Sequence, residues 1–302
     1  NRYPDSTAAK LVEAFSKAYG VPKECVAAGN GSDELISLLI SSFLEPGDRV
    51  VVATPDFSMY QFYTELHGAK AEVYSKTEDF KVDFDDLIAL CRQPDVKLLI
   101  FSNPCNPTGV LYPKADVERL AKELPILVAV DEAYMEFADE TQQMLTDVEK
   151  YDNLVVLKTL SKAYGLASLR LGFGVANREL TKALLKVKSV YNVNGLSQEL
   201  GRIMLGHTDR MKENVRRLKE GRKKLYGELL KACAGHPIKV YDTSTNFVLI
   251  RAEGSAKKIL DELLAKKIKI RMLEGKYLRI TAGTEEENAR FIKEFESILK
   301  TL

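Results

Sequence analysis

Short apolar runs alternate with amphipathic stretches over the first two thirds of the chain. Six runs rich in β-branched residues predict strands over residues 49–53, 71–74, 97–101, 126–130, 153–157 and 171–175. The stretches 59–67, 84–91 and 115–124 between them place apolar side chains at helical spacing and predict helices. Continuously apolar strands that alternate with helices indicate an α/β fold, with a mostly parallel sheet covered by helices.

Two more helices are predicted ahead of the first of these strands. One follows Asp5, whose carboxylate is a suitable N-cap, and ends at Gly20. The other runs from about Ser32 to Leu44, where a Pro-Gly-Asp turn follows.

The pattern changes after about residue 190. A long polar helix is predicted over 208–233, helices over 256–265 and from Glu285 onward, and strands over 246–251, 268–272 and 277–281. We therefore predict a large α/β domain over residues 1–205. Residues 206–302 would form a linking helix and a smaller C-terminal α+β domain.

Composition and charge exclude several classes of protein. The 302 residues are 45% hydrophobic and 29% charged, which is typical of a soluble globular protein. The chain has 44 basic and 43 acidic residues, so its net charge is close to zero. We therefore expect no positive electrostatic field that would attract a nucleic acid. The apolar runs are too short to cross a membrane. The four cysteines have neither metal-ligand nor disulfide-framework spacing, so we predict free thiols in a reducing cytoplasm and no metal.

Polar residues follow several of the apolar runs. In open parallel sheets, ligands bind beyond the carboxyl ends of the strands, so these residues are candidates for chemistry. Asp131 ends one run, and the Pro- and Gly-rich loop 102–109 follows another and would hold an Asn amide rigidly. Lys162 lies among small and hydroxyl residues, with Arg170 nearby. Burial and a neighbouring cation both lower the pKa of an amine, which makes a lysine nucleophilic.

A fourth segment, Gly29–Glu34, opens a predicted helix with free backbone amides that suit a phosphate. It lacks the spacing of a dinucleotide or Walker loop. Taken alone, each of the four segments has an ordinary explanation as a turn, a structural ion pair, a surface lysine or an N-cap. Together, a reactive lysine, an aspartate able to pair with a pyridinium nitrogen and a phosphate cradle predict a pyridoxal-phosphate site.

Nine segments, in this order, match one enzyme family. They are Asn1-Arg2-Tyr3-Pro4, GNGSDE (29–34), TPDFSMY (54–60), NPCNPTG (103–109), VDEAYMEF (130–137), TLSKAYGLASLRLG (159–172), YNVNG (191–195), TNFVLIR (245–251) and LRITAGT (278–284). On these segments the chain resembles the fold type I, pyridoxal-phosphate-dependent aminotransferases, and among them the histidinol-phosphate aminotransferases.

The resemblance implies pyridoxal 5′-phosphate as the cofactor and a role for each residue around it. Lys162 would be the Schiff-base lysine, and Asp131 would pair with the pyridine nitrogen. Tyr134 and Asn106 would hydrogen-bond the ring's O3′ oxygen, while Phe57 would stack on the ring in place of the family's tyrosine. The residues implied to hold the cofactor phosphate are Thr159, Ser161, Arg170, and Ser32 and Asp33 through their backbone amides.

The resemblance also implies substrate contacts and a partner. Arg279, assisted by Arg271, would bind the anionic group of the substrate. Tyr3 would reach the cofactor phosphate of a neighbouring subunit, which implies a homodimer with shared active sites. Family members carry a further segment ahead of the position of Asn1 that supplies part of the substrate pocket, and the link 272–276 is shorter than in the family.

The implied activity is transfer of an amino group from histidinol phosphate to 2-oxoglutarate, in histidine biosynthesis, with Lys162 moving the proton and with ping-pong kinetics. Two alternatives share the cofactor site: a lyase similar to threonine-phosphate decarboxylase, and an aromatic amino-acid aminotransferase, because Arg279 could bind a carboxylate as readily as a phosphate. Segments 191–194 and 278–284 favour the aminotransferase over the lyase. A non-enzymatic sensor joined to a DNA-binding domain is disfavoured, since no basic patch accompanies it.

Overall fold

The computed structural model describes residues 2–302, and Asn1 lies outside the described residues. The first part of the chain forms α1 (Ala9–Tyr19), β1 (Val26–Asn30), α2 (Ser32–Phe43), β2 (Arg49–Thr54), α3 (Met59–Leu66), β3 (Lys70–Ser75), α4 (Phe84–Cys91), β4 (Val96–Ser102), α5 (Lys114–Glu123), β5 (Leu127–Asp131), β6 (Leu154–Thr159), β7 (Leu171–Ala176), α6 (Arg178–Val187) and α7 (Gly195–Leu205). The second part forms α8 (Thr208–Ala232), β8 (Lys239–Tyr241), β9 (Phe247–Arg251), α9 (Ala256–Ala265), β10 (Arg271–Leu273), β11 (Tyr277–Thr281) and α10 (Glu285–Leu299).

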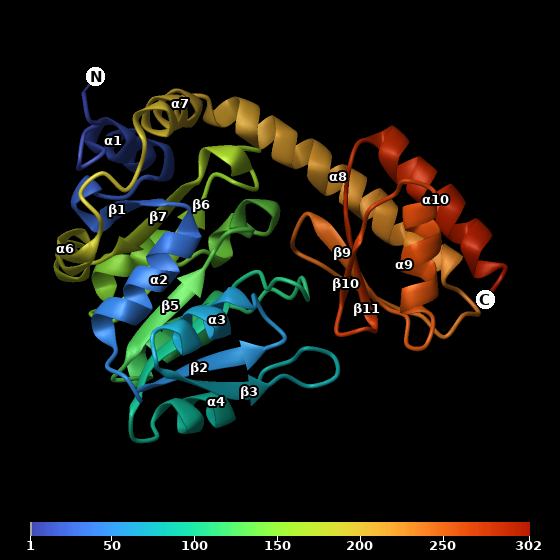
Figure 1. Ribbon diagram of the computed structural model, residues 1–302, viewed down its shortest axis with the longest axis horizontal. Coiled ribbons are helices and arrows are strands. Elements are labelled where there is room, and N and C mark those ends of the chain that lie inside the picture. Colours follow the sequence, from blue (N-terminus) through green and yellow to red (C-terminus); the bar gives the residue numbers. More distant parts are fainter. Residues whose placement is uncertain (1) are drawn as a thin grey trace.

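A seven-stranded sheet in the order β1-β7-β6-β5-β4-β2-β3 forms the centre of the first part (Figure 1). Strands β2 to β6 pair in parallel, and β7 is antiparallel to both of its neighbours. The predicted fold class, a mostly parallel sheet covered by helices, is confirmed.

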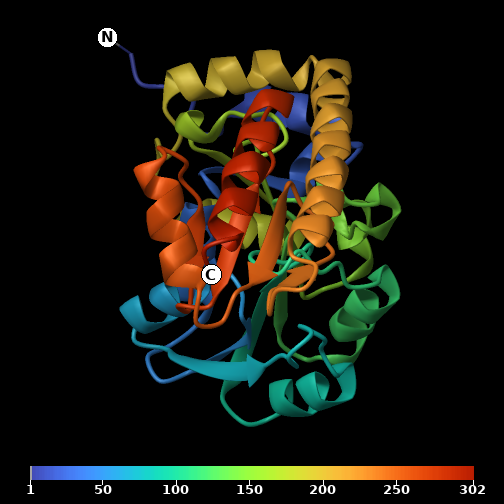
Figure 2. The same ribbon diagram turned by 90° about the vertical axis from the view of Figure 1, so that its right-hand side faces the viewer.

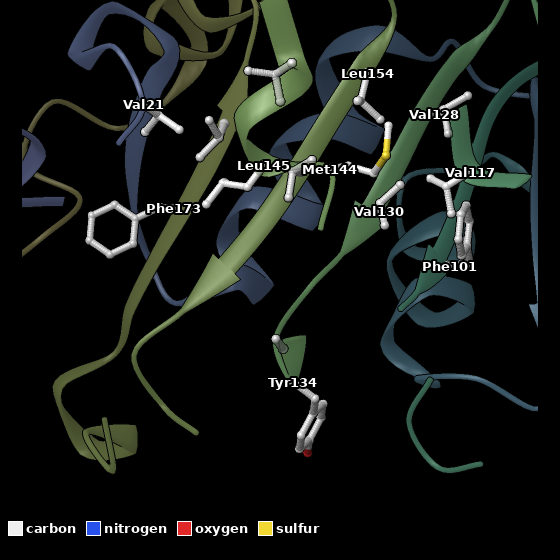
Figure 3. Close-up of a cluster of buried hydrophobic side chains, with 14 of the residues drawn as sticks. Val21, Phe101, Val117, Val128, Val130, Tyr134, Met144, Leu145, Leu154 and Phe173 are labelled. Atoms are coloured by element: carbon white, nitrogen blue, oxygen red, sulfur yellow. The ribbon is translucent and has the colours of Figure 1, made fainter. Parts of the chain in front are cut away.

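Both faces of the central strands β4, β5, β6 and β7 are buried, whereas the edge strand β3 is largely exposed. Successive side chains of each strand point to opposite faces. On β5, Val128 and Val130 join one apolar cluster, whereas Ala129 between them joins another cluster that includes α2. Figure 3 shows Val128 and Val130 beside Phe101 on the first of these faces. The continuous apolar runs seen in the sequence follow from this two-sided burial.

The second part contains a four-stranded antiparallel sheet in the order β10-β11-β9-β8. Its apolar cluster includes side chains of α8, α9 and α10. The long helix α8 links the two parts (Figure 1), and α10 packs against it (Figure 2). The division of the chain between residues 205 and 206 stays a prediction. No helix within residues 2–302 is both long and apolar enough to cross a membrane.

Some elements differ from the predicted ones. Strand β1 was not predicted, because Ala27, Ala28 and Gly29 are small rather than β-branched. The strand predicted over 268–272 is wrong in its first half. There, the backbone N–H of Ile268 bonds Leu263 O at the end of α9, after Lys267 in the left-handed conformation, so β10 starts only at Arg271.

Candidate active site

The carboxyl ends of three neighbouring strands bring polar residues to one edge of the sheet. Ser102 ends β4 and lies in register with Asp131, which ends β5. Thr159 ends β6, the next strand along the sheet. Because parallel strands point the same way, these residues meet at the edge where ligands bind in open α/β sheets.

A cavity of about 150 Å³ opens at this edge. Every residue implied to hold the cofactor, except Tyr3, lines it: Ser32, Asp33, Phe57, Asn106, Asp131, Tyr134, Thr159, Ser161, Lys162 and Arg170. Lys162 also borders a larger cavity of about 720 Å³, formed by α8 and the start of α10. Lys162 is therefore the residue that the two cavities share.

Asp131 is a buried carboxyl group with unusual surroundings. Tyr60 donates its hydroxyl to Oδ2 at 2.9 Å, and the backbone N–H of Ala133 donates to Oδ1 at 3.0 Å. Burial raises the pKa of Asp131 to about 6, although these hydrogen bonds and the charge of Lys162 oppose the rise. No cation among residues 2–302 forms an ion pair with Asp131. A ligand with a protonated ring nitrogen fits this position, because it would supply the missing positive charge.

The start of α2 forms the opposite part of the cavity. Its N-cap residue, Gly31, has no side chain to cap the helix and has φ of 82°. A Cβ atom at Gly31 would lie 2.6 Å from Arg170 Nη2, and one at Gly172 would lie 2.3 Å from the backbone nitrogen of Ser32. Both glycines are thus required for the close approach of the α2 amides, β7 and the guanidinium group.

Hydroxyl groups and a guanidinium group also line the cavity, together with the start of α2. Thr159 Oγ1 donates to Ser161 Oγ at 3.0 Å, and Arg170 Nη2 pairs with Asp33 Oδ2 at 2.8 Å. Arg170 itself has φ of 52°, a conformation that non-glycine residues rarely adopt. Uncapped helix amides, hydroxyls and a guanidinium together form the donor set that a phosphate group requires. The residues present therefore fit pyridoxal 5′-phosphate at both its ring nitrogen and its phosphate.

Aromatic side chains border the middle of the cavity. Lys162 Nζ lies 5.4 Å from the centroid of the Tyr134 ring. Tyr134 stands beyond the end of β5, away from the strands (Figure 3). Phe57 contacts Tyr60 edge to face, with the ring centroids 5.5 Å apart. Lys162, Tyr134 and Phe57 therefore line the same cavity as Asp131 and Arg170.

Arg279 lies next to this cavity but belongs to β11. Its Nη1 donates to Asn106 Oδ1, and its guanidinium lies 5.0 Å from the centroid of the Phe247 ring. Its Nε is buried without a hydrogen-bond partner among residues 2–302, and burial lowers the pKa of the guanidinium. Arg271 is exposed and lies in register opposite Arg279 on β10. Two like charges in register repel each other, so an anion bound between them would be stabilised.

Tyr3 does not lie at the cavity. It is 79% exposed and stacks on Tyr191, with ring centroids 4.6 Å apart. Its implied role at the cofactor of a second subunit stays a prediction.

Sequence reasoning missed the residues that support the predicted site. Tyr60 lines the cavity and bonds Asp131, while Asp56 bonds Ser102. Tyr60 and Asp56 lie in the segment 54–60 that resembles the family. No spacing rule connects Asp56 with Ser102, 46 positions away, or Tyr60 with Asp131, 71 positions away. The absence of a bound metal stays a prediction. Within residues 2–302 no group of three metal-ligating side chains occurs, and all four cysteines are buried and free.

The chain is similar to known proteins over nearly its whole length. The profile of the aminotransferase class I and II family matches residues 1–295. The chain is 41% identical to a histidinol-phosphate aminotransferase of Clostridium novyi, over 97% of this chain and 82% of the relative. Among solved structures, the histidinol-phosphate aminotransferase of Clostridium acetobutylicum has a TM-score of 0.90 at 25% identity, covering 100% of this chain and 92% of that one. The enzyme of the same name from Sinorhizobium meliloti, solved with pyridoxal-5′-phosphate, has a TM-score of 0.91 at 23% identity, covering 99% and 83%.

Proposed function

The chain belongs to the class I and II aminotransferases and is therefore a pyridoxal-phosphate enzyme with an amino donor and a keto acid as substrates, and on this premise we propose that it transfers the amino group of histidinol phosphate to 2-oxoglutarate. The convergence of Lys162, Asp131 and the start of α2 on one cavity supports the cofactor chemistry. The observation that carries the choice of a phosphorylated donor is the buried Nε of Arg279, which has no partner among residues 2–302, with Arg271 in register opposite it. The cytoplasmic location and the place in histidine biosynthesis stay predictions.

The bound cofactor supplies an electron sink that stabilises negative charge at the α-carbon of the amino donor. Asp131, buried and without a cationic partner of its own among residues 2–302, keeps the proton on the ring nitrogen. Tyr134 and Asn106 would hydrogen-bond the O3′ oxygen of the cofactor, and Phe57 would pack against its ring. Lys162 takes the proton from the α-carbon of the donor. It would deliver this proton to C4′ of the cofactor.

The phosphate of the cofactor is held by Arg170, the hydroxyls of Thr159 and Ser161, and the backbone amides of Ser32 and Asp33. These groups bind without taking part in proton transfer. They would hold the cofactor in the cavity that Lys162 also lines.

Substrate choice rests on the two arginines of the smaller sheet. The buried Arg279 Nε has no partner among residues 2–302, and Arg271 adds a second cation in register. A donor with a phosphate group can accept from both guanidinium groups. This charge, and the similarity to the histidinol-phosphate aminotransferase of Clostridium novyi, favour histidinol phosphate over an aromatic amino acid.

We also propose that the protein works as a homodimer with shared sites. Helix α7 exposes Leu196, Leu200 and Ile203, which are 79%, 45% and 41% exposed and repeat at helical spacing. Tyr3 and Tyr191 add exposed aromatic surface. An apolar stripe of this kind is typical of a surface that another protein covers. A second copy that used the same surface would form a closed, symmetric pair.

Product analysis tests the activity. The holoenzyme is incubated with 2-oxoglutarate and, in turn, with histidinol phosphate, threonine phosphate and phenylalanine. We expect glutamate to form fastest from histidinol phosphate, with no release of carbon dioxide. Carbon dioxide from threonine phosphate would support the lyase instead, and faster glutamate formation from phenylalanine would support the aromatic aminotransferase.

A further inference from the structure

A buried ion pair lies next to Ser102, which lines the cofactor cavity, and contributes to none of the cofactor or substrate contacts described so far. Lys76 follows β3, and its Nζ lies 3.4 Å from Asp56 Oδ2, with both side chains fully buried. The ammonium group also donates to Pro55 O at 2.8 Å and to Cys105 Sγ at 3.2 Å. Its three protons therefore have three acceptors, two from the segment before Phe57 and one from the loop before Asn106.

The carboxylate of Asp56 is the centre of this arrangement. Besides Lys76, it accepts from the backbone N–H of Phe57 at 2.7 Å and from the backbone N–H of Ser102 at 3.2 Å. It also accepts from the hydroxyl of Ser102. A carboxylate only accepts hydrogen bonds, so four donors around it leave no ambiguity in its orientation. Asp56 thus joins the segment that carries Phe57 to the end of β4.

The chain of hydrogen bonds continues from Ser102 to the site. Ser102 Oγ accepts from the backbone N–H of Asn106 at 3.0 Å. The side-chain oxygen of Asn106 accepts from Arg279 Nη1. The amide NH₂ of Asn106 is then the group that remains to donate to the O3′ oxygen of the cofactor.

We propose that Asp56, neutralised by Lys76, is a positioning residue that fixes Asn106 through Ser102 and so aligns the cofactor ring with the substrate-binding Arg279. The inference rests on the proposed function, because it needs a cofactor at the cavity. Asp56 contacts neither the cofactor nor the substrate in this scheme. It sets the place of the Phe57 ring and of the Asn106 amide together.

Asp56→Asn tests the proposal, because it keeps the size of the side chain but replaces one accepting oxygen with an NH₂ group. That NH₂ group would meet hydrogen-bond donors and could not accept from them. The first readout is the pH midpoint of the visible absorbance change of the holoenzyme. Donation from Asn106 stabilises the deprotonated O3′ oxygen, so misplacing the amide should raise this midpoint by about half a pH unit or more. Asp147→Asn is the control, since Asp147 is also largely buried and paired with two lysines but lies outside the network.

The second readout is a double-mutant cycle with Asn106→Ala. We expect Asp56→Asn to lower kcat/KM about tenfold in the natural chain, but less than about twofold when Asn106 is already alanine. A merely structural role would give effects that multiply. Multiplying effects, or a midpoint that stays at the wild-type value, would overturn the proposal.

Asp56→Asn leaves Lys76 buried without its carboxylate, which endangers folding. Ser102→Ala is therefore the second variant, because it removes the hydroxyl link and leaves both charges paired. The same two results are expected of it. If the natural chain shows no visible cofactor band, the proposed function fails; if it shows the band and both variants match it, only the positioning role fails.

Discussion

The substitution Asp131→Asn should change how the stability of the cofactor-free protein depends on pH. Burial raises the pKa of Asp131 from 3.8 to about 6 in the folded chain. Between these values the folded protein binds more protons at this residue than the unfolded chain does. The free energy of unfolding therefore falls as the pH rises through this window. Asparagine does not titrate, so the variant lacks this contribution.

The size of the effect follows from the shift. About two pKa units correspond to about 3 kcal/mol over the whole window, of which roughly 1 kcal/mol is lost between pH 5 and pH 7. Glu132 is also buried, with a pKa raised to about 7, and it adds a loss in the same direction. Because Glu132 is present in both proteins, its contribution cancels when the variant is compared with the natural chain.

Urea unfolding of the two cofactor-free proteins at pH 5, 6 and 7 measures this difference. The natural chain should lose about 1 kcal/mol relative to Asp131→Asn across the series. Adding pyridoxal 5′-phosphate should abolish the loss, because a protonated ring nitrogen then balances the ionised carboxylate. A difference between the two proteins that stays constant with pH would refute the reasoning.

Four further predictions concern the site and the assembly. Lys162→Ala should abolish the lysine-dependent visible band and lower kcat by about a thousandfold or more. Absorbance and steady-state rates measure these effects, and a variant with normal turnover would contradict the role of Lys162. Gly172→Ala should raise the dissociation constant of pyridoxal 5′-phosphate about tenfold, measured by titration, because its Cβ would lie 2.3 Å from the backbone nitrogen of Ser32; unchanged affinity would argue against that close approach. Arg279→Met should raise KM for a phosphorylated donor about tenfold or more while cofactor affinity changes little, and an unchanged KM would remove Arg279 from the substrate site. Leu196→Glu should shift the protein from dimer to monomer in analytical ultracentrifugation, and an unaltered sedimentation coefficient would place the interface elsewhere.

The sequence was informative where one segment carries its own signal. Lys162, Asp131 and the segment 29–34 were candidates because each follows an apolar run or opens a helix. Their combination predicted the site, and the structure brings all three to one cavity. The strands were predictable for a similar reason. Burial on both faces leaves a continuous apolar run that any single strand displays by itself.

What could not be predicted depends on contacts across the fold. The run at 171–175 predicts a strand, but nothing within it reveals that β7 is antiparallel to its neighbours. The hydrogen bond from Tyr60 to Asp131 joins residues 71 positions apart, and the ion pair of Asp56 with Lys76 joins two different loops. Such partners become neighbours only when the sheet order brings their segments together. The residues that hold the site in place could therefore not be predicted from the sequence. The residues expected to react could be.

A single-turnover reaction with histidinol phosphate tests the central claim most directly. The purified holoenzyme is mixed with the donor in the absence of any keto acid, and the keto product and the visible cofactor band are followed together, with Lys162→Ala as the control. We expect one equivalent of keto product per site, loss of the band, and its recovery when 2-oxoglutarate is added. A band that histidinol phosphate leaves unchanged, or keto product formed equally by Lys162→Ala, would contradict it.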